Sequence, residues 1–482
     1  MKLSNILKNI KYELIQGSLD IDIKDISYNS KNIDKNYAFT ALIGIDTDGH
    51  KFINEAINNG ANCIFICKDI KINNDLITII KVDDTRTKLS YISANFFNNP
   101  QDKLIKIGIT GTKGKTSTSW MLKKILEENG EKVGVIGTLG TYINNEKYSH
   151  KNTTPESYQI QKFMNIMVNN NVKYLIMEVS SQALKVGRIN NIIFDYAIFT
   201  NLSIDHIGPR EHPTFEDYIN SKALLFKQSK IGILNMDDSK YKDMIKDATC
   251  KILTYGTNKN SNLCISNIKF INNKEFLGTE FKLNNSTYRV SAPGKFSCYN
   301  AASAIYICKL LNIDNNIIKK GLENFFVDGR CEIININNKF KIVIDFAHNK
   351  ISMESIIKTM REFNCNRIIT IFGCGGGRSF ERRYELGEVS GKLSDLSIIT
   401  TDNPRNDNID SIINDIKKGI IDQNGKYIII KDRKKAIEYA IDNANVNDII
   451  LLLGKGHEKY QEIKGIRYPF DEKSIIKSYI NK

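Results

Sequence analysis

The 482-residue sequence lacks the features that mark membrane and secreted proteins. It contains no run of about 18 apolar residues, the length that a membrane-spanning helix requires. Its first residues, Met1–Asn5, begin neither a long apolar stretch nor a small-residue cleavage site of a secretory signal. We therefore expect a cytoplasmic protein without a membrane partner. Hydrophobic residues make up 41% and charged residues 25%, which argues against wholesale disorder.

Cysteine pairs of the CxxC type are also absent. The nine cysteines are scattered and odd in number, and the chain is long, so a disulfide framework is disfavoured. Cys63 and Cys67 lie in an apolar stretch, where we expect buried, reduced thiols in a strand.

No basic and aromatic patch of the kind that binds nucleic acid is present, although the net charge is +14. That charge would suit nucleic acid, a membrane surface or phosphorylated small molecules. The lysines are spread along the whole chain, and a solvated lysine-rich surface accounts for them equally well. We expect no nucleic-acid partner.

The length predicts about two to four domains. A polar stretch at 98–103 marks a linker, and a third region begins near 328–330, so we expect domains at 1–98, 99–328 and 329–482. Short apolar runs between helical patterns indicate parallel strands in βαβ units, with ligand sites beyond their carboxyl ends. These runs are Leu104–Ile109, Tyr174–Met177, Tyr196–Phe199, Lys341–Asp345, Ile368–Phe372 and Ile449–Leu453.

A glycine-rich loop, Thr110–Thr116, lies between the first of these strands and a helix with apolar Met121, Leu122, Ile125 and Leu126 on one face. Glycines let backbone N–H groups turn toward phosphate oxygens, and the helix N-terminus adds positive partial charge. Lys115 can reach the β- and γ-phosphates, and Thr116 can bind Mg²⁺. The ATP-binding candidates are Thr110, Gly111, Thr112, Lys113, Gly114, Lys115, Thr116 and Ser117.

The loop departs from the general Walker pattern, which has Gly where this chain has Ile109. With that departure, Thr-Gly-Thr-x-Gly-Lys-Thr resembles the Mur ligase family, whose members add amino acids to the peptidoglycan precursor. The resemblance extends over nearly the whole chain. It implies an N-terminal UDP-binding α/β domain, a central P-loop ATPase-like parallel sheet and a C-terminal Rossmann-like α/β domain.

The resemblance also implies roles for residues of the first two regions. Ser30 is the candidate contact to uridine diphosphate, and Thr153, Thr154, Ser180 and Arg188 are candidates for holding the UDP-linked dipeptide. The implied metal ligands are Thr116, Glu178 and His206, and Lys222 matches a lysine that is carbamylated in the family. Carbamylation turns an ammonium into a carboxylate that can bind Mg²⁺. The implied catalytic residues are Lys115, Glu178, His206 and Lys222.

Further matches imply contacts to the nucleotide and to the incoming amino acid. Asn300 matches an adenine contact, and Arg330, Asp345 and His348 match contacts to the rest of the nucleotide. The amino-acid site would comprise Arg378, Asp402, Asn403, Arg405, Gly454 and Glu458.

The choice of amino acid depends on Arg405, which fits a clamp for the distal carboxylate of meso-diaminopimelate. Lysine has no such carboxylate. Two departures keep L-lysine open: Asp407 stands where diaminopimelate enzymes have Glu, and the stretch 205–218 is similar to lysine-adding members.

The implied reaction is an ATP-dependent amide ligation on UDP-MurNAc-L-Ala-D-Glu through an acyl phosphate, with Mg²⁺ and a monomeric enzyme. It needs positioning and charge neutralisation, consistent with the lack of an evident nucleophile–base pair. The alternatives are a folylpolyglutamate synthase-like ligase, which gives no reason for a UDP domain, and a non-catalytic nucleotide-binding paralogue.

Overall fold

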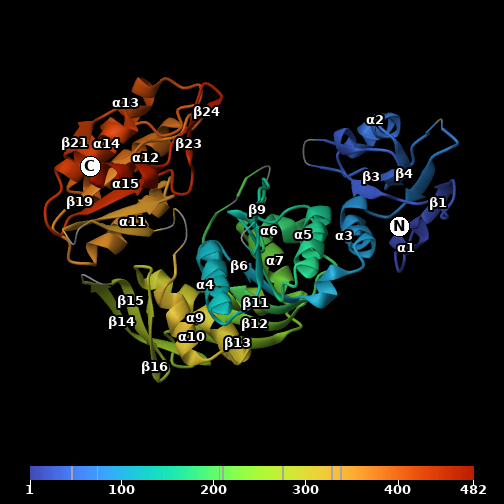
Figure 1. Ribbon diagram of the computed structural model, residues 1–482, viewed down its shortest axis with the longest axis horizontal. Coiled ribbons are helices and arrows are strands. Elements are labelled where there is room, and N and C mark those ends of the chain that lie inside the picture. The colour runs from blue at the N-terminus through green and yellow to red at the C-terminus, as the bar shows by residue number, and fades with distance from the viewer. Residues whose placement is uncertain are drawn as a thin grey trace. The chain divides into compact units, whose positions relative to one another are not determined.

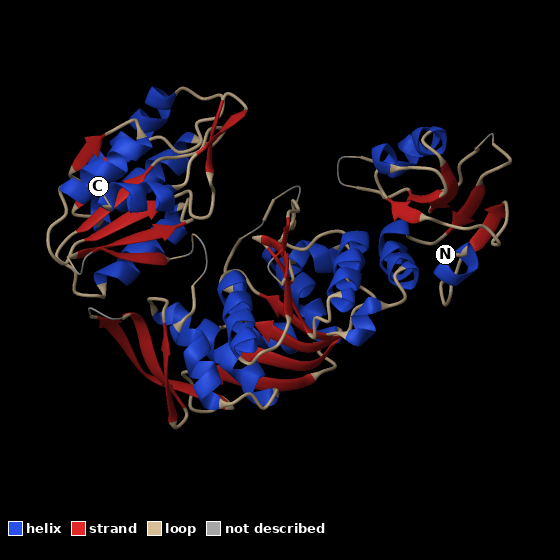
Figure 2. Cartoon of the chain, viewed as in Figure 1, coloured by secondary structure: helices blue, strands red, loops and turns tan. Residues whose placement is uncertain are grey.

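The computed structural model describes residues 1–44, 47–72, 74–144, 146–205, 207–208, 211–273, 276–326, 329, 331–336 and 339–481. The chain divides into two compact units, Met1–Ile265 with Tyr299–Gly321, and Ser266–Cys298 with Leu322–Lys482. Figure 1 traces the chain from blue to red, and Figure 2 shows helices flanking the strands of each sheet. The architecture is that of three α/β domains, as predicted, whereas the domain boundaries stay a prediction.

The N-terminal part of the first unit carries a five-stranded sheet of order β1-β5-β4-β3-β2. All its neighbours are parallel except β1 and β5. Cys63 is buried in β4, as expected, and Cys67 follows the strand half-buried. The elements are α1 (Leu3–Ile6), β1 (Glu13–Gln16), β2 (Asp25–Ser27), η1 (Ser30–Asn32), β3 (Tyr37–Thr40), η2 (Gly49–Phe52), α2 (Ile53–Asn58), β4 (Ala61–Ile66), β5 (Thr78–Lys81), α3 (Thr85–Phe96) and η3 (Pro100–Lys103).

The central part contains six parallel strands in the order β13-β12-β11-β6-β10-β7, of which β6, β10 and β11 are the predicted apolar runs. An antiparallel extension, β8 and β9, follows β7 and was not predicted. The elements are β6 (Ile105–Thr110), α4 (Lys115–Glu128), β7 (Val133–Gly137), β8 (Gly140–Ile143), β9 (Glu146–Tyr148), α5 (Ser157–Asn169), β10 (Tyr174–Glu178), α6 (Ser181–Lys185), β11 (Phe194–Phe199), α7 (Phe215–Lys227), β12 (Ser229–Asn235), α8 (Tyr241–Ile245), β13 (Lys251–Gly256), α9 (Lys295–Leu310) and α10 (Asn315–Glu323).

The second unit contains a six-stranded sheet of order β17-β18-β22-β19-β20-β21, parallel except for β17. Its central strands β18, β19 and β22 are the three apolar runs predicted there. The elements are β14 (Leu263–Asn272), β15 (Leu277–Leu283), β16 (Ser286–Val290), β17 (Glu332–Ile336), β18 (Phe340–Asp345), α11 (Lys350–Arg361), β19 (Ile368–Phe372), α12 (Phe380–Leu393), β20 (Leu396–Ile399), α13 (Ile409–Asp422), β21 (Tyr427–Ile429), α14 (Arg433–Asp442), β22 (Ile449–Leu453), β23 (Tyr460–Ile463), β24 (Ile466–Pro469) and α15 (Glu472–Ile480).

Parallel strands bring their carboxyl ends to one edge of the sheet, and this positions the site. In the central sheet, β6 pairs with β10 so that Ile109 faces Glu178, and β10 also pairs with β7. The predicted apolar face of α4 is buried at Met121, Leu122, Ile125 and Leu126. Among the described residues, no helix combines the length and the apolar character that crossing a bilayer requires.

Candidate active site

The phosphate loop joins β6 to the N-terminus of α4, as predicted. Gly111 and Gly114 have φ angles of +143° and +86°, which disfavour any residue with a Cβ. A Cβ would also collide with the Thr200 hydroxyl at Gly111 and with the Asn300 amide at Gly114. The Lys115 ammonium donates to the carbonyls of Gly111 (2.7 Å) and Thr112 (3.1 Å). The positive φ angles of the two glycines and the hydrogen bonds of Lys115 thus form one compact loop, with Asn300 beside it.

The carboxylate of Glu178, at the end of β10, is 1% exposed and lies beside this loop. Its Oε2 accepts hydrogen bonds from the hydroxyls of Thr116 and Thr138, both at 2.9 Å. The Thr138 Oγ1 lies 3.1 Å from that of Thr153. Four chain segments therefore contribute oxygen atoms to one small region, and three of the predicted site residues, Thr116, Thr153 and Glu178, are brought together.

This oxygen-rich set is the donor chemistry that Mg²⁺ prefers, because Mg²⁺ in phosphate sites takes one or two carboxylates and the phosphates themselves. In the described part of the chain, no group of three or more His, Cys, Asp and Glu side chains forms a ready-made metal cage. A single buried carboxylate with hydroxyls fits an ion that arrives with a phosphate. His206, the other predicted ligand, lies outside the described residues.

Lys222 lies on α7, which begins after Thr214, and the Thr214 hydroxyl accepts from the Asp217 N–H at 3.1 Å. The Lys222 side chain is buried, its Nζ donates to the Gly111 carbonyl at 3.1 Å, and it lies 4.5 Å from the centre of the Tyr218 ring. Burial, reinforced by nearby Lys115, holds the pKa of Lys222 well below its ordinary value. A buried amine with a lowered pKa therefore stands next to the phosphate loop.

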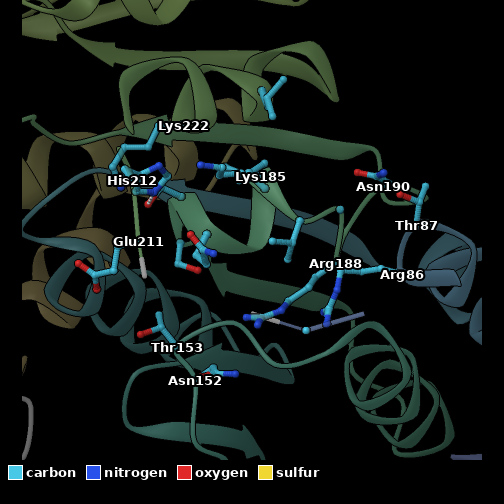
Figure 3. A pocket seen from close by; sticks show the side chains of 18 of the residues that line it. Arg86, Thr87, Asn152, Thr153, Lys185, Arg188, Asn190, Glu211, His212 and Lys222 are labelled. Carbon is cyan, nitrogen blue, oxygen red and sulfur yellow. Dashed lines mark hydrogen bonds between the residues drawn. The ribbon is translucent and has the colours of Figure 1, made fainter. Parts of the chain in front are cut away.

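A cavity of about 1140 Å³ opens beside the loop and is lined by Lys115, Thr153, Ser180, Arg188 and Lys222 among others (Figure 3). Arg188 donates to the Thr154 carbonyl and to Glu156, both at 2.9 Å. The Thr154 hydroxyl donates to the Glu178 carbonyl (2.8 Å) and accepts from the Ser180 N–H (3.0 Å). Thr154 therefore fixes the backbone of Glu178 and Ser180, two other predicted site residues.

Ser30 is buried and donates to Glu55 at 2.6 Å. It lines a second cavity of about 490 Å³ in the same unit. Arg86 and Glu156 line this cavity too, and Arg86 also lines the larger one. The Ser30 cavity thus adjoins the loop cavity through shared walls.

In the second unit, the predicted amino-acid residues Asp402, Asn403, Gly454 and Glu458 lie together. The Asn403 amide donates to Glu458 at 2.8 Å, and its oxygen accepts from buried Lys455 at 3.0 Å. A Cβ on Gly454 would collide with the Asp402 carboxylate. Asn403, Glu458 and Lys455 therefore form one hydrogen-bonded cluster, the Asp402 carboxylate lies 3.9 Å from the Lys455 Nζ, and Gly454 lies against Asp402.

Arg405 extends from the same loop with φ +51°, a conformation that non-glycine residues rarely adopt. Its guanidinium donates to the Gly376 carbonyl at 3.1 Å, and its side chain is 45% exposed. Asp407 accepts from the Gly377 N–H at 2.9 Å and pairs with Arg383. The Gly377 N–H, helped by Arg383, lowers the pKa of Asp407. Asp407 therefore anchors the glycine-rich loop that carries exposed Arg378.

Asp345, at the end of β18, accepts from the N–H groups of Cys331 (2.7 Å) and Ala347 (2.8 Å). The His348 ring bonds the Phe346 carbonyl at 2.8 Å. Asp345 thus links its turn to Cys331, and His348 bonds within its own turn. Arg330 lies outside the described residues. Nucleotide contacts by these three residues stay predictions.

The sequence interpretation missed Thr138, Glu156 and Lys455. Thr138 follows the last residue of β7, so a search of every parallel strand end would have found it. Glu156 lies two residues after the predicted Thr154 but has no motif of its own. Lys455 lies inside a predicted segment, and nothing in the local sequence signals that it is fully buried.

Comparison with known proteins gives consistent matches along the chain. Family models match at 22–97 (Mur ligase family, catalytic domain), 109–308 (Mur ligase middle domain) and 329–456 (Mur ligase, glutamate ligase domain). A Clostridium acetobutylicum protein called UDP-N-acetylmuramoyl-L-alanyl-D-glutamate–2,6-diaminopimelate ligase 1 is 41% identical over 100% of both chains.

Solved structures agree in fold. A UDP-N-acetylmuramoyl-L-alanyl-D-glutamate–2,6-diaminopimelate ligase is 26% identical, with a TM-score of 0.74 over 100% of this chain and 99% of that one. The Mycobacterium tuberculosis folylpolyglutamate synthase matches with a TM-score of 0.59 and 15% identity over 75% of this chain and 91% of its own. The synthase match shows shared fold alone and leaves a quarter of this chain uncovered.

Proposed function

The chain belongs to the Mur ligase family, and on that basis we propose that it joins a diamino acid to UDP-MurNAc-L-Ala-D-Glu using ATP. The observation that carries the proposal is the meeting of Lys115, Thr116, Thr153 and Glu178 beside a cavity large enough for an extended substrate. The adjoining cavity around Ser30 supports an extended UDP-linked substrate in particular.

The reaction has two chemical steps. A carboxylate oxygen of the D-glutamate side chain forms a bond to the γ-phosphorus of ATP, and the bond to ADP breaks. The amine then forms a C–N bond to the acyl phosphate, and inorganic phosphate leaves. Lys115 would face the phosphate oxygens and stabilise their developing charge, and Arg188 and Thr153 would orient the dipeptide.

Thr116 and Glu178 would hold Mg²⁺, with His206 as the third ligand that the family resemblance implies. When bound, the ion would neutralise phosphate charge. We further propose that Lys222 is carbamylated. Its lowered pKa supports this, because a neutral amine, not an ammonium, reacts with carbon dioxide.

We propose meso-diaminopimelate as the amino acid, with L-lysine as the alternative. Arg405 is a partly exposed guanidinium beside the cluster of Asp402, Asn403 and Glu458, which suits a distal carboxylate and amine. The full-length relative at 41% identity is called a 2,6-diaminopimelate ligase. The Asp407 carboxylate accepts a hydrogen bond from Gly377 and anchors that loop. The presence of Asp where diaminopimelate enzymes have Glu therefore does not count against meso-diaminopimelate.

The test measures phosphate release from ATP and Mg²⁺ with UDP-MurNAc-L-Ala-D-Glu and each of meso-diaminopimelate, L-lysine and other diamino acids. We expect turnover with meso-diaminopimelate and much less with L-lysine. Preference for L-lysine would overturn the role of Arg405. Absence of turnover with every acceptor would favour a non-catalytic paralogue or a ligase for another substrate.

We place the reaction in the cytoplasm and expect a monomer. Light scattering on the purified protein measures its mass against the 54.9 kDa of one chain.

A further inference from the structure

Asp217, His212 and Ser181 form a hydrogen-bonded row, and two of them, His212 and Ser181, line the loop cavity. The His212 Nδ1 lies 2.6 Å from the Asp217 Oδ2, and the His212 Nε2 lies 2.9 Å from the Ser181 Oγ. His212 is 1% exposed and Ser181 is 5% exposed, yet both line the cavity with Lys115 and Lys222. Figure 3 shows His212 and Lys222 at the same end of that cavity.

The partners of the ring decide which nitrogen carries a proton. A carboxylate can only accept, so in a neutral ring Nδ1 donates to Asp217 and Nε2 accepts from the Ser181 hydroxyl. Burial alone would raise the pKa of Asp217, but Lys185 at 2.7 Å and His212 outweigh it and lower that pKa. Asp217 is therefore ionised at neutral pH and stabilises a positive charge on His212.

We propose that Ser181 and His212 form a relay that takes a proton from the incoming amine, with Asp217 stabilising the resulting imidazolium. The inference deepens the proposed function and rests on it. An amino acid in neutral water is an ammonium, which has no lone pair with which to attack an acyl phosphate. The structure places a proton acceptor in the same cavity: the His212 Nε2, which accepts a hydrogen bond from the Ser181 hydroxyl.

The proton balance is complete without another reactant. One ammonium proton passes to the Ser181 oxygen as the hydroxyl proton passes to the His212 Nε2. The neutral amine then forms the C–N bond, and the C–O bond to phosphate breaks with its electron pair. The second proton of the nitrogen leaves with inorganic phosphate, and His212 returns its proton to solvent after product release.

The charges around His212 come from several elements. Asp217 and the Tyr218 ring, 5.2 Å away, belong to α7, and Lys185 belongs to α6. Lys115 and Lys222 share the cavity. Among these groups, Asp217 is the carboxylate that contacts the His212 ring directly.

The test separates deprotonation of the amine from every earlier step by changing the nucleophile. Hydroxylamine is largely unprotonated at neutral pH and traps an acyl phosphate as a hydroxamate without a base. We expect His212→Gln to slow ligation of the diamino acid by about 100-fold, within the range for general-base catalysis, and to leave hydroxamate formation within about twofold of wild type. Ser181→Ala should show the same split with a smaller loss.

A matched control exists in His50, whose Nδ1 also lies 2.6 Å from a carboxylate, that of Asp48. Its Nε2 instead accepts from the Cys67 N–H, and His50 lines neither cavity described above. His50→Gln should therefore leave the ratio of the two products unchanged.

Equal loss of both products in His212→Gln and Ser181→Ala would overturn the relay, as would unchanged ligation in both variants. If wild type forms neither product, the proposed function itself fails, and that outcome is distinct from a failure of the relay. Thermal melting of each variant identifies loss of fold.

Discussion

Two lysines, one in each unit, are equally hidden from solvent and differ in what surrounds them. Lys222 is 2% exposed and contacts a backbone carbonyl and the Tyr218 ring beside the phosphate loop. Lys455 is 0% exposed and donates to Asn403, with Glu458 at 3.5 Å and Asp402 at 3.9 Å. Burial lowers the pKa of both, but only Lys455 has two carboxylates in close contact that oppose the shift.

The difference shows that burial alone does not decide the role of a lysine. The lowered pKa of Lys222 favours the neutral amine, which is the reactive form of a lysine side chain. Lys455 is held among negative charges, where its ammonium orients the amide and carboxylate that we propose for amino-acid recognition. We therefore assign Lys222 a chemical role and Lys455 a positioning role.

The strongest test of this comparison is Lys222→Met. We expect turnover to fall by about 1000-fold, in line with loss of the preorganised charge of the carbamate that we propose there. In carbon dioxide-free buffer the melting temperature should rise, because no amine is then buried. Phosphate release and calorimetry measure the two effects. Lys227→Met, on the exposed end of the same helix, is the matched control. A lower melting temperature for Lys222→Met would contradict the comparison.

Lys455→Met should have the opposite effect on stability. Removing the ammonium leaves the Glu458 and Asp402 carboxylates without their cationic partner, and breaking a buried ion pair costs about 3–5 kcal/mol. Denaturant unfolding measures the loss. Lys459→Met, at a position with a 73% exposed side chain in the same segment, should change little. Equal free energies of unfolding for Lys455→Met and Lys459→Met would mean that the stability of the cluster does not depend on Lys455.

Arg405→Ala sharpens the contrast within the second unit. Loss of a charged hydrogen bond, worth about 1.5–3 kcal/mol, should raise the KM for meso-diaminopimelate by roughly 10–100-fold and leave kcat nearly unchanged. Steady-state kinetics with L-lysine provide the internal control, since its KM should not move. A similar change for both amino acids would remove Arg405 from the distal carboxylate.

The smallest effect concerns pH. In carbon dioxide-free buffer, the unfolded chain binds one more proton at Lys222 than the folded chain, between the lowered folded pKa and the ordinary value of 10.5. The stability of wild type relative to Lys222→Met should therefore increase as pH rises from about 7 toward about 10. Melting temperatures of both proteins across this range measure the difference. A constant difference would show that Lys222 does not titrate there.

Much of the fold could be predicted from the sequence because short apolar runs bounded by loops are local features. Ile368–Phe372 and Ile449–Leu453 are strands with the predicted bounds. The β8 and β9 extension could not be predicted, because its strands Gly140–Ile143 and Glu146–Tyr148 are too short to show a clear period.

The functional sites also divide into those that could be predicted from local sequence and those that could not. The loop Thr110–Thr116 is contiguous, so its residue types and spacing suffice to predict a phosphate site. The row from Asp217 through His212 to Ser181 is not contiguous, and neither is the set of hydroxyls around Glu178. Hydrogen bonds across long sequence separations leave no periodic signal.

By itself, the sequence determined that this chain has a phosphate loop between a strand and a helix, parallel α/β sheets and the motifs of its family. Only the tertiary structure decided that Lys222 and Lys455 are buried, which charges face them and which hydroxyl faces His212. The physical reason is that local backbone preference and apolar patterning act between near neighbours in sequence. Desolvation and charge pairing depend on what the fold packs around each side chain.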